Sequence, residues 1–202
     1  MNENNQVIAE GRVKIFNPES GEVFVEQCNA IHFENMSEAI ALSIGNKATG
    51  FIHEMHFGNG GTSVDPTGVI TYLPAVNTGQ NADLYNQTFF KVVDDTSSLN
   101  TDPTRNKIEI RHVPGAVFTD LLVTCLLDYG EPAGQAAFDN SENLDSDFVF
   151  DELGLKSWVG TVGTGKLLTH VIFHPVQKSL NRLIQIDYTV RFQTLTNLST
   201  NA

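Results

Sequence analysis

Two pairs of histidines are the first residues in this sequence whose spacing could suit a metal ion. His53 and His56 resemble the zinc motif HExxH, in which two histidines four residues apart share one face of a helix. Here the spacing is three, in a segment with the pattern of a strand, so the two side chains are predicted on opposite faces. His170 and His174 share a face of a strand, but at roughly 13 Å apart they are too distant to bind one ion. We therefore predict structural roles for these histidines and no metal site.

A glycine-rich segment from Gly160 to Lys166 nearly matches the phosphate-binding loop of nucleotide-binding proteins. That motif requires Ser or Thr after the lysine, where this sequence has Leu167, and it opens into a helix whose N-terminus faces the phosphates. Here the next residues, 167–173, have the pattern of a strand. The segment is therefore predicted to be a glycine hairpin turn, and no cofactor is expected.

The acidic run from Asp139 to Asp147 resembles a calcium-binding loop in composition. The calcium loop of EF-hand proteins has Gly at position six and Glu at position twelve, and here those positions hold Leu144 and Phe150. A solvated surface loop is the favoured interpretation, with a calcium site as the alternative. No local signature of a catalytic nucleophile is present either, so we predict no catalytic residues. A protein that is not an enzyme is expected, with a hydrolase as the less favoured alternative.

Charge and composition exclude several classes of protein. The 202 residues include 12 basic and 24 acidic ones, which gives a net charge of −12. The basic residues are spread along the chain without a cluster, which argues against nucleic-acid binding and against a polybasic membrane anchor. No run reaches the ~18 apolar residues that a membrane helix needs, and the polar N-terminus has no signal-peptide pattern. With 41% hydrophobic residues the chain can bury a core.

The two cysteines, Cys28 and Cys125, each stand in an apolar stretch far apart in the sequence. Two buried free thiols are the favoured interpretation, because free cysteine is among the most buried residue types. A disulfide between them is the alternative, but two cysteines in 202 residues are sparse for a disulfide framework.

Strict alternation in residues 184–193 predicts a half-buried antiparallel strand, with Ile186 and Tyr188 on the inner face and Asp187 on the outer face. Residues 167–173 form another strand, and residues 117–127 are apolar enough to predict a central strand covered on both sides. Weaker strands are predicted at residues 7–16, 22–27, 51–57, 68–73, 88–93 and 107–113.

One short helix is predicted at residues 36–44, with Asn35 as its cap, Glu38 completing the capping pattern and Gly45 at its end. Long loops are expected at residues 58–66, 94–106 and 130–147. The fold class is therefore mainly β, an antiparallel β-sandwich or barrel-like domain with one short α-helix. Residues 7–193 are expected to form a single domain between a polar N-terminal arm, 1–6, and a polar C-terminal tail, 194–202.

Three stretches together resemble the small β-rich virion proteins of tailed bacteriophages. They are the helix followed by Gly50-Phe-Ile-His-Glu-Met-His-Phe-Gly-Asn-Gly-Gly-Thr62, then Phe148-Val-Phe-Asp-Glu-Leu-Gly-Leu155, then Leu167-Leu-Thr-His-Val-Ile-Phe-His-Pro-Val-Gln-Lys178 with the final alternating strand. The resemblance spans roughly residues 32–193, and it is one of pattern. It implies a structural subunit of the neck, collar, tail or baseplate, located in the virion after assembly in the host cytoplasm.

The partners that this resemblance implies are copies of the chain itself and other virion proteins, with no sequence-specific nucleic-acid contact and no membrane. A capsid decoration protein is one alternative. A receptor- or glycan-binding β-sandwich is another, with Trp158 or Tyr85 as a platform on which a sugar ring could stack. Symmetric contacts between subunits would then form a homo-oligomer.

The predicted phase of the last strand can be tested by substitution. We expect Ile186→Asp or Tyr188→Asp to abolish folding, because burying an unpaired carboxylate costs at least several kcal/mol, against a total stability of about 5–15 kcal/mol. Asp187→Asn on the outer face should leave stability nearly unchanged. Urea unfolding followed by circular dichroism measures both, and equal tolerance at the two faces would contradict the strand phase.

Overall fold

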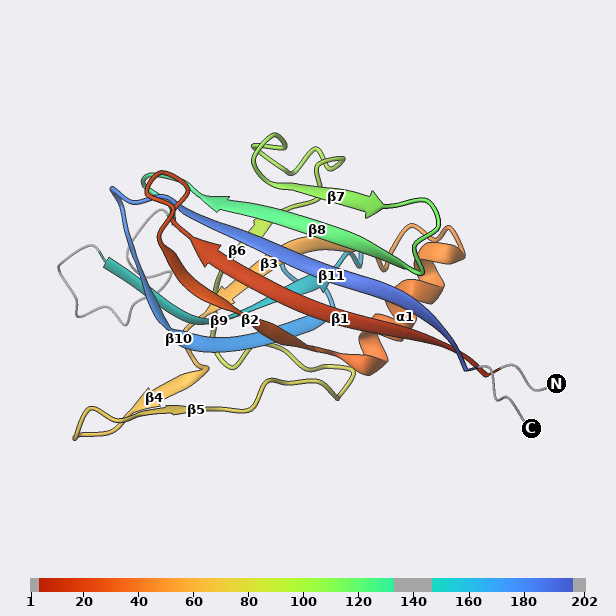
Figure 1. Cartoon of the computed structure of the whole chain (residues 1–202). Coiled ribbons are helices and arrows are strands. Elements are labelled where there is room, and N and C mark those ends of the chain that lie inside the picture. Colours follow the sequence, from red (N-terminus) through yellow and green to blue (C-terminus); the bar gives the residue numbers. More distant parts are fainter. Residues whose placement is uncertain (1–3, 133–146, 198–202) are drawn as a thin grey trace.

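The computed structural model describes residues 4–132 and 147–197 (Figure 1). The elements within these residues are, in chain order, β1 (Asn4–Phe16), β2 (Val23–Ile31), α1 (Phe33–Ile44), β3 (Ile52–Gly58), β4 (Thr62–Val64), β5 (Ile70–Tyr72), β6 (Gln87–Val92), β7 (Lys107–His112), β8 (Phe118–Leu127), β9 (Asp147–Ser157), β10 (Thr169–Ser179) and β11 (Ile184–Asn197). The protein is therefore mainly β with one helix in the described part, as predicted.

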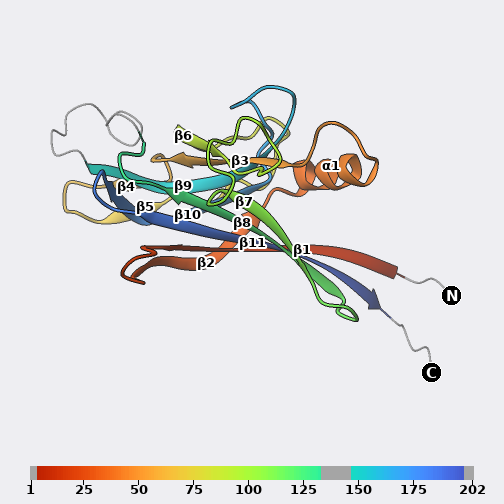
Figure 2. The same cartoon turned by 90° about the horizontal axis from the view of Figure 1, so that it is seen from above.

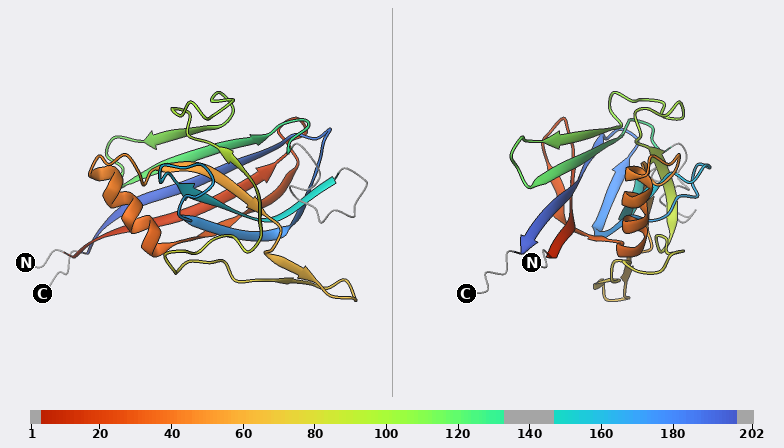
Figure 3. Two further views of the ribbon diagram at one scale, coloured as in Figure 1. Left: turned by 180° about the vertical axis from the view of Figure 1, so that it is seen from behind. Right: turned by 90° about the vertical axis from the view of Figure 1, so that its right-hand side faces the viewer.

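Nine of the described strands form one antiparallel sheet in the order β6-β3-β9-β10-β2-β1-β11-β8-β7. The sheet curls into a half-barrel, which is visible when the molecule is seen end-on (Figure 3). Its two halves meet where β10 and β2 share only two residue pairs, Thr169 with Ile31 and His170 with Ala30. The strands β4 and β5 form a separate hairpin outside this sheet.

The inner face of the half-barrel holds the hydrophobic core. On β11 the inward residues Ile184, Ile186, Tyr188 and Val190 are fully buried, which confirms the alternation predicted for this strand. Strands β1, β3, β8, β9 and β10 contribute side chains to the same cluster. The half-barrel is thus filled by its own side chains, as close-packed protein interiors are.

Helix α1 lies at the end of the half-barrel from which the two chain termini emerge (Figures 2 and 3). It begins three residues earlier than predicted, because the cap is His32 and not Asn35: the His32 Nδ1 accepts a hydrogen bond of 3.2 Å from the Asn35 N–H. Met36 and Ala39 of α1 belong to the core cluster. Gly45 ends the helix, as predicted. Among the described residues, no helix has the length and apolar character needed to cross a membrane.

Side chains link β6, at one edge of the sheet, to β8, the strand next to the other edge. Lys91 of β6 donates from Nζ to the Leu126 carbonyl of β8 at 2.7 Å and pairs with Glu131 at 2.6 Å. On the same segment of β8, the Leu126 N–H donates to Oδ1 of Asn106 at 2.9 Å. Leu126 lies beyond Thr124, the last residue of β8 that pairs with β7. The side chains of Lys91 and Asn106 therefore supply the hydrogen bonds that a neighbouring strand would otherwise make with the main chain of β8.

Strand β8 lies between β7 and β11, one strand from the edge, and yet both of its faces are covered over residues 122–127. The inward Val123 and Cys125 are fully buried, and the outward Leu122 and Leu126 are buried as well. The prediction of a strand covered on both sides is therefore confirmed for this half of β8.

Four strands differ from the sequence-based expectation. The ladder of β1 and β11 runs to the pair of Asn4 and Asn197, so residues 4–6 and 194–197 belong to strands and not to the arms expected there. Strand β4 forms within the segment expected as a loop and pairs with β5. Strand β9 has no alternating pattern because it is buried on both faces. Main-chain pairing needs no particular side chains, so polar strand ends give a weak sequence signal.

The link between β6 and β8 can be tested at Lys91. We expect Lys91→Met to lower the free energy of unfolding by about 1.5–3 kcal/mol, because the Leu126 carbonyl and the Glu131 carboxylate lose a charged donor. Lys47→Met removes an exposed lysine and serves as the matched control. Chemical denaturation of the two variants checks the difference, and equal midpoints would contradict the bridging role.

Candidate functional site

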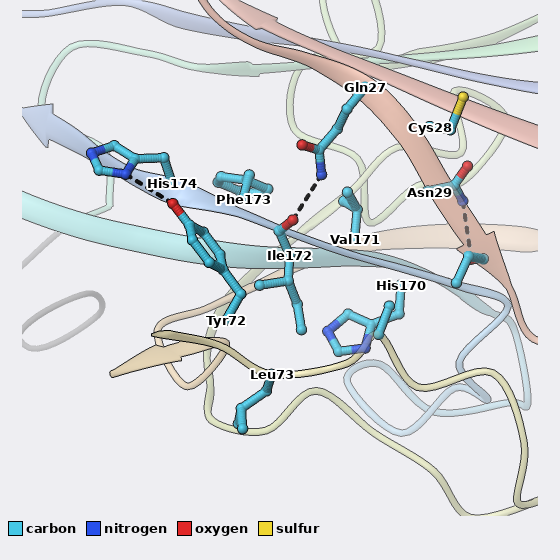
Figure 4. A pocket seen from close by; sticks show the side chains of 12 residues that line it. Gln27, Cys28, Asn29, Tyr72, Leu73, His170, Val171, Ile172, Phe173 and His174 are labelled. Carbon is cyan, nitrogen blue, oxygen red and sulfur yellow. Dashed lines mark hydrogen bonds between the residues drawn. The ribbon is translucent and has the colours of Figure 1, made fainter. Parts of the chain in front are cut away.

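A groove opens on the outer face of the sheet where β2 and β10 separate (Figure 4). Beyond the pair of His170 and Ala30 the two strands diverge, and Gln27 spans the gap by donating from Nε2 to the Ile172 carbonyl at 2.7 Å. The cavity has a volume of about 400 Å³. Its lining comes from residues 27–30 of β2, from residues 170–174 of β10, and from Tyr72, Leu73 and Ala75. The segment 72–76, at the end of β5 and just after it, is called the covering segment below.

The two histidines of β10 have different roles in this groove. His170 is fully buried, and its Nδ1 accepts a hydrogen bond of 2.9 Å from the Val76 N–H. This contact assigns the ring proton to Nε2, which donates to the Glu152 carboxylate at 3.0 Å. His174 is exposed, and its Nδ1 lies 3.1 Å from the Tyr72 hydroxyl. His170 thus fastens the covering segment to the sheet, and the His174 ring faces the open groove.

Glu152 of β9 holds four donors at once. Besides His170, the main-chain N–H groups of Gly60, Tyr85 and Asn86 donate to its two oxygens at 3.1, 3.0 and 2.8 Å. Burial alone would raise the pKa of Glu152, but these hydrogen bonds outweigh it and hold the pKa below its usual value. A carboxylate offers about four acceptor positions, so this one is fully occupied by the protein itself.

The neighbouring carboxylate, Asp151, fastens the base of the β4–β5 hairpin. It accepts hydrogen bonds from the N–H groups of Gly61 and Thr62 at 2.9 and 2.8 Å, and from the Thr62 hydroxyl. Burial raises the pKa of Asp151 despite these donors, and the charge of Glu152 adds to the effect. The two adjacent acids of β9 therefore both bind the turn between β3 and β4, and Glu152 also binds the segment before β6.

The structure brings His53 and His56 to the same carboxylate, which contradicts their predicted separation on opposite faces. The nearest atoms of the two rings lie 3.4 and 2.7 Å from Glu54. The pairing of β3 with β9 shifts register between Ile52 and Glu54, and such a bulge breaks the alternation on which the prediction relied. Gly163 also donates its N–H to Glu54, at 2.9 Å. In the part of the chain that the structure describes, no group of three His, Cys, Asp or Glu side chains could hold a metal ion.

The glycine-rich segment 160–166 is a turn between β9 and β10, as predicted. Its Gly163 N–H binds the Glu54 carboxylate, and Lys166 pairs with Glu38 of α1 at 2.6 Å. The segment thus uses a main-chain donor and a lysine, the groups that would contact a phosphate, for acids of the same chain. Residues 139–146 of the acidic run lie outside the described residues.

The prediction of two buried thiols is right for one cysteine and wrong for the other. Cys125 is fully buried, and burial raises the pKa of its thiol to about 12. Cys28 is exposed and lines the groove, because alternation in β2 directs it outward while Val25 and Ile31 point to the core. Both thiols are free.

The two aromatic residues proposed as a sugar platform are each engaged with a different histidine. The Trp158 ring packs on His53 with centroids 4.4 Å apart. The Tyr85 ring lies 5.8 Å from His170, and its hydroxyl donates to the Pro74 carbonyl at 2.8 Å. Neither ring lines the groove between β2 and β10.

The acids Asp151 and Glu152 are the cluster that the sequence interpretation missed. They stand in the run Phe148-Val-Phe-Asp-Glu-Leu-Gly-Leu155, between apolar residues on both sides. A charged pair inside an apolar strand needs internal donors, and that signal alone could have identified the cluster.

Comparison with protein-family models, with curated proteins and with solved structures found no match.

The role of Glu152 predicts a pH-dependent stability. Its pKa is lower in the folded chain than the usual value of 4.5, so its contribution is full above that pH and is lost as the pH falls through the folded-state value. We expect Glu152→Gln to cost about 3 kcal/mol at neutral pH, because an amide cannot accept from all four donors. The difference in free energy of unfolding between Glu152→Gln and the parent chain should become smaller at acidic pH.

The exposed Asp95→Asn is the control for this variant, and it should leave the unfolding midpoint nearly unchanged. Urea titrations between neutral and acidic pH measure both. A penalty for Glu152→Gln that stays constant with pH would contradict the assignment.

Proposed function

We propose that the chain is a structural subunit of a tailed-phage virion, which mediates contacts between subunits in the neck, collar or tail. The observation that carries the proposal is the β4–β5 hairpin, which projects from the sheet (Figure 1), exposes apolar side chains and is anchored by the buried Asp151. The phage assignment itself is supported by the pattern of residues 32–193 in the sequence.

The β4–β5 hairpin has the character of a contact device. Its exposed apolar side chains include Val64 and Val69, which are 62% and 57% exposed, together with Tyr72 and Leu73. An isolated two-stranded hairpin is marginally stable in water, so it needs an anchor. Asp151 supplies that anchor at the base, and the Leu73 N–H donates to the Gly61 carbonyl at 2.9 Å. Exposed apolar side chains on an anchored projection are typical of a protein–protein contact.

The use of the buried acids also favours a scaffold over a catalyst. A general acid or base must keep a free position for the substrate. The Glu152 carboxylate gives its positions to His170 and to main-chain donors, and Glu54 contacts two histidines and Gly163. These groups therefore serve to hold loops in place, which is the task expected of a subunit that presents surfaces to its neighbours.

The partners in this proposal are copies of the chain and other virion proteins. The net charge of −12 disfavours a DNA contact and keeps free subunits apart until specific surfaces meet. A capsid decoration protein would use the same surfaces at another position in the particle. A glycan-binding β-sandwich is the alternative of a different class.

The hairpin contact can be tested during infection. We expect a tagged copy of the chain to be recovered in density-purified particles, and Val64→Asp or Val69→Asp to lower its incorporation by about tenfold or more, as for a central interface residue. Val113→Asp is the matched control, because Val113 is 64% exposed but lies outside the hairpin. All three variants should melt like the parent chain.

Recovery of the tagged chain only outside the particles, together with binding to a glycan array, would instead support the glycan-binding alternative. Equal incorporation of the hairpin variants and the Val113 control would contradict the contact role of the hairpin.

A further inference from the structure

Strand β1 has a free edge over its first half. It pairs with β11 along its whole length, from Asn4 to Phe16, whereas β2 pairs with it only from Gly11 onward. At Ile31 strand β2 ends and the chain turns into α1. Within the described residues, positions 4–10 therefore form a projecting ribbon with β11 and have no strand on the other side (Figures 1 and 2).

The direction of the hydrogen bonds identifies the main-chain groups on this edge. Thr194 of β11 donates its N–H to the Val117 carbonyl, on the β8 side, at 3.0 Å. Alternate residues of a strand point their N–H and C=O groups to opposite sides, so Val7, which pairs with Thr194, directs its own groups away from β11. Asn5 and Ala9 share the orientation of Val7. These three residues leave their N–H and C=O groups directed at the free side.

This edge lacks the features with which proteins protect exposed strands. The outermost strand β7 carries Lys107, Glu109 and Arg111 in alternation, and such charges discourage pairing with another chain. Residues 4–10 of β1 contain a single charge, Glu10, and no proline. The β1 edge is thus open to a partner strand in a way that the β7 edge is not.

The surroundings of the β1 edge suit an incoming strand. Glu10 pairs in register with Arg191, so the projecting ribbon is locally neutral in a chain of charge −12. A cavity of about 830 Å³ lies beside the edge where β2 leaves the sheet, and its lining includes Ala9, Ile31 and the exposed Phe33. Two copies could approach each other here without the repulsion that the net charge imposes elsewhere.

We propose that the β1 edge docks the same edge of a second copy, as an antiparallel pair around a twofold axis at Val7. In this register Asn5 faces Ala9 of the second copy, and Glu10 faces Asn4 and not another Glu10. The three outward residues of each strand then form about six main-chain hydrogen bonds. The pair joins two half-barrels into one continuous sheet, with the same surface used by both copies. The choice of a second copy as partner rests on the proposed assembly role.

Sedimentation equilibrium of the purified full chain across the micromolar range tests the pairing. We expect a monomer–dimer equilibrium whose association constant each of Val7→Lys and Val7→Pro lowers by about tenfold or more. Val7→Lys places two like charges opposite each other at the axis, and Val7→Pro removes the two central N–H donors. Melting should change little, because the Val7 N–H takes no part in the β1–β11 ladder. Ile110→Lys on β7 is the matched control, with 65% exposure against 66% for Val7, and it should leave the dimer intact.

A crosslinking experiment tests the register. In a Cys28→Ser background, Val7→Cys should form a disulfide-linked dimer on mild oxidation, because facing Cα atoms in such a pair lie about 5.5 Å apart. Ala9→Cys should not, because the two Ala9 residues stand on opposite sides of the axis. A chain that stays monomeric, a dimer insensitive to Val7→Lys, or equal crosslinking at both positions would overturn the proposal. None of these outcomes alters the incorporation result for the hairpin variants, so the two proposals can fail separately.

Discussion

The buried carboxylate of Glu152 ties together parts of the chain that are far apart in sequence. It binds the turn after β3 through Gly60, the segment before β6 through Tyr85 and Asn86, and β10 through His170. A buried charge is tolerated only when its hydrogen-bonding capacity is filled, so the loops must adopt the positions in which their N–H groups meet it. The outer face of β9 and β10 thereby acquires a fixed cover, and the groove beside β2 acquires its second wall.

The same logic recurs at Glu54 and at Lys91. Glu54 contacts two histidines and the Gly163 N–H, and Lys91 reaches from the edge strand β6 to β8, the strand next to the other edge. The inner face is held mainly by apolar contact, with Lys91 beside Met55 as a charged exception, whereas the outer face is organised by buried acids that each accept several hydrogen bonds. Loops that would otherwise move are in this way made into defined surfaces.

The sequence predicts the fold class well because alternation reports burial directly. Strand β11 and the end of α1 at Gly45 follow from that pattern and from helix-ending chemistry. The failures have two physical causes, a local departure from regular pairing and a misjudged phase of alternation. The register shift in β3 brings His53 and His56 together, whereas Cys28 is exposed because regular alternation in β2 directs it outward, between the polar Gln27 and Asn29. The cluster around Glu152 depends on contacts between residues 18 to 92 positions apart in the sequence, for which a single sequence carries no periodic signal.

The ladder between β1 and β11 has a mechanical consequence. Asn4 and Asn197 are partners in it, so the two ends of the described chain leave the molecule side by side. Tension applied between these ends would pull the two strands apart in an unzipping geometry, in which the hydrogen bonds are loaded one pair after another, and would open the ribbon at low force. Tension between one of these ends and the opposite end of the sheet would instead load many hydrogen-bonded pairs at once, in a shear geometry. The same domain would therefore resist stretching along one direction and yield along the other.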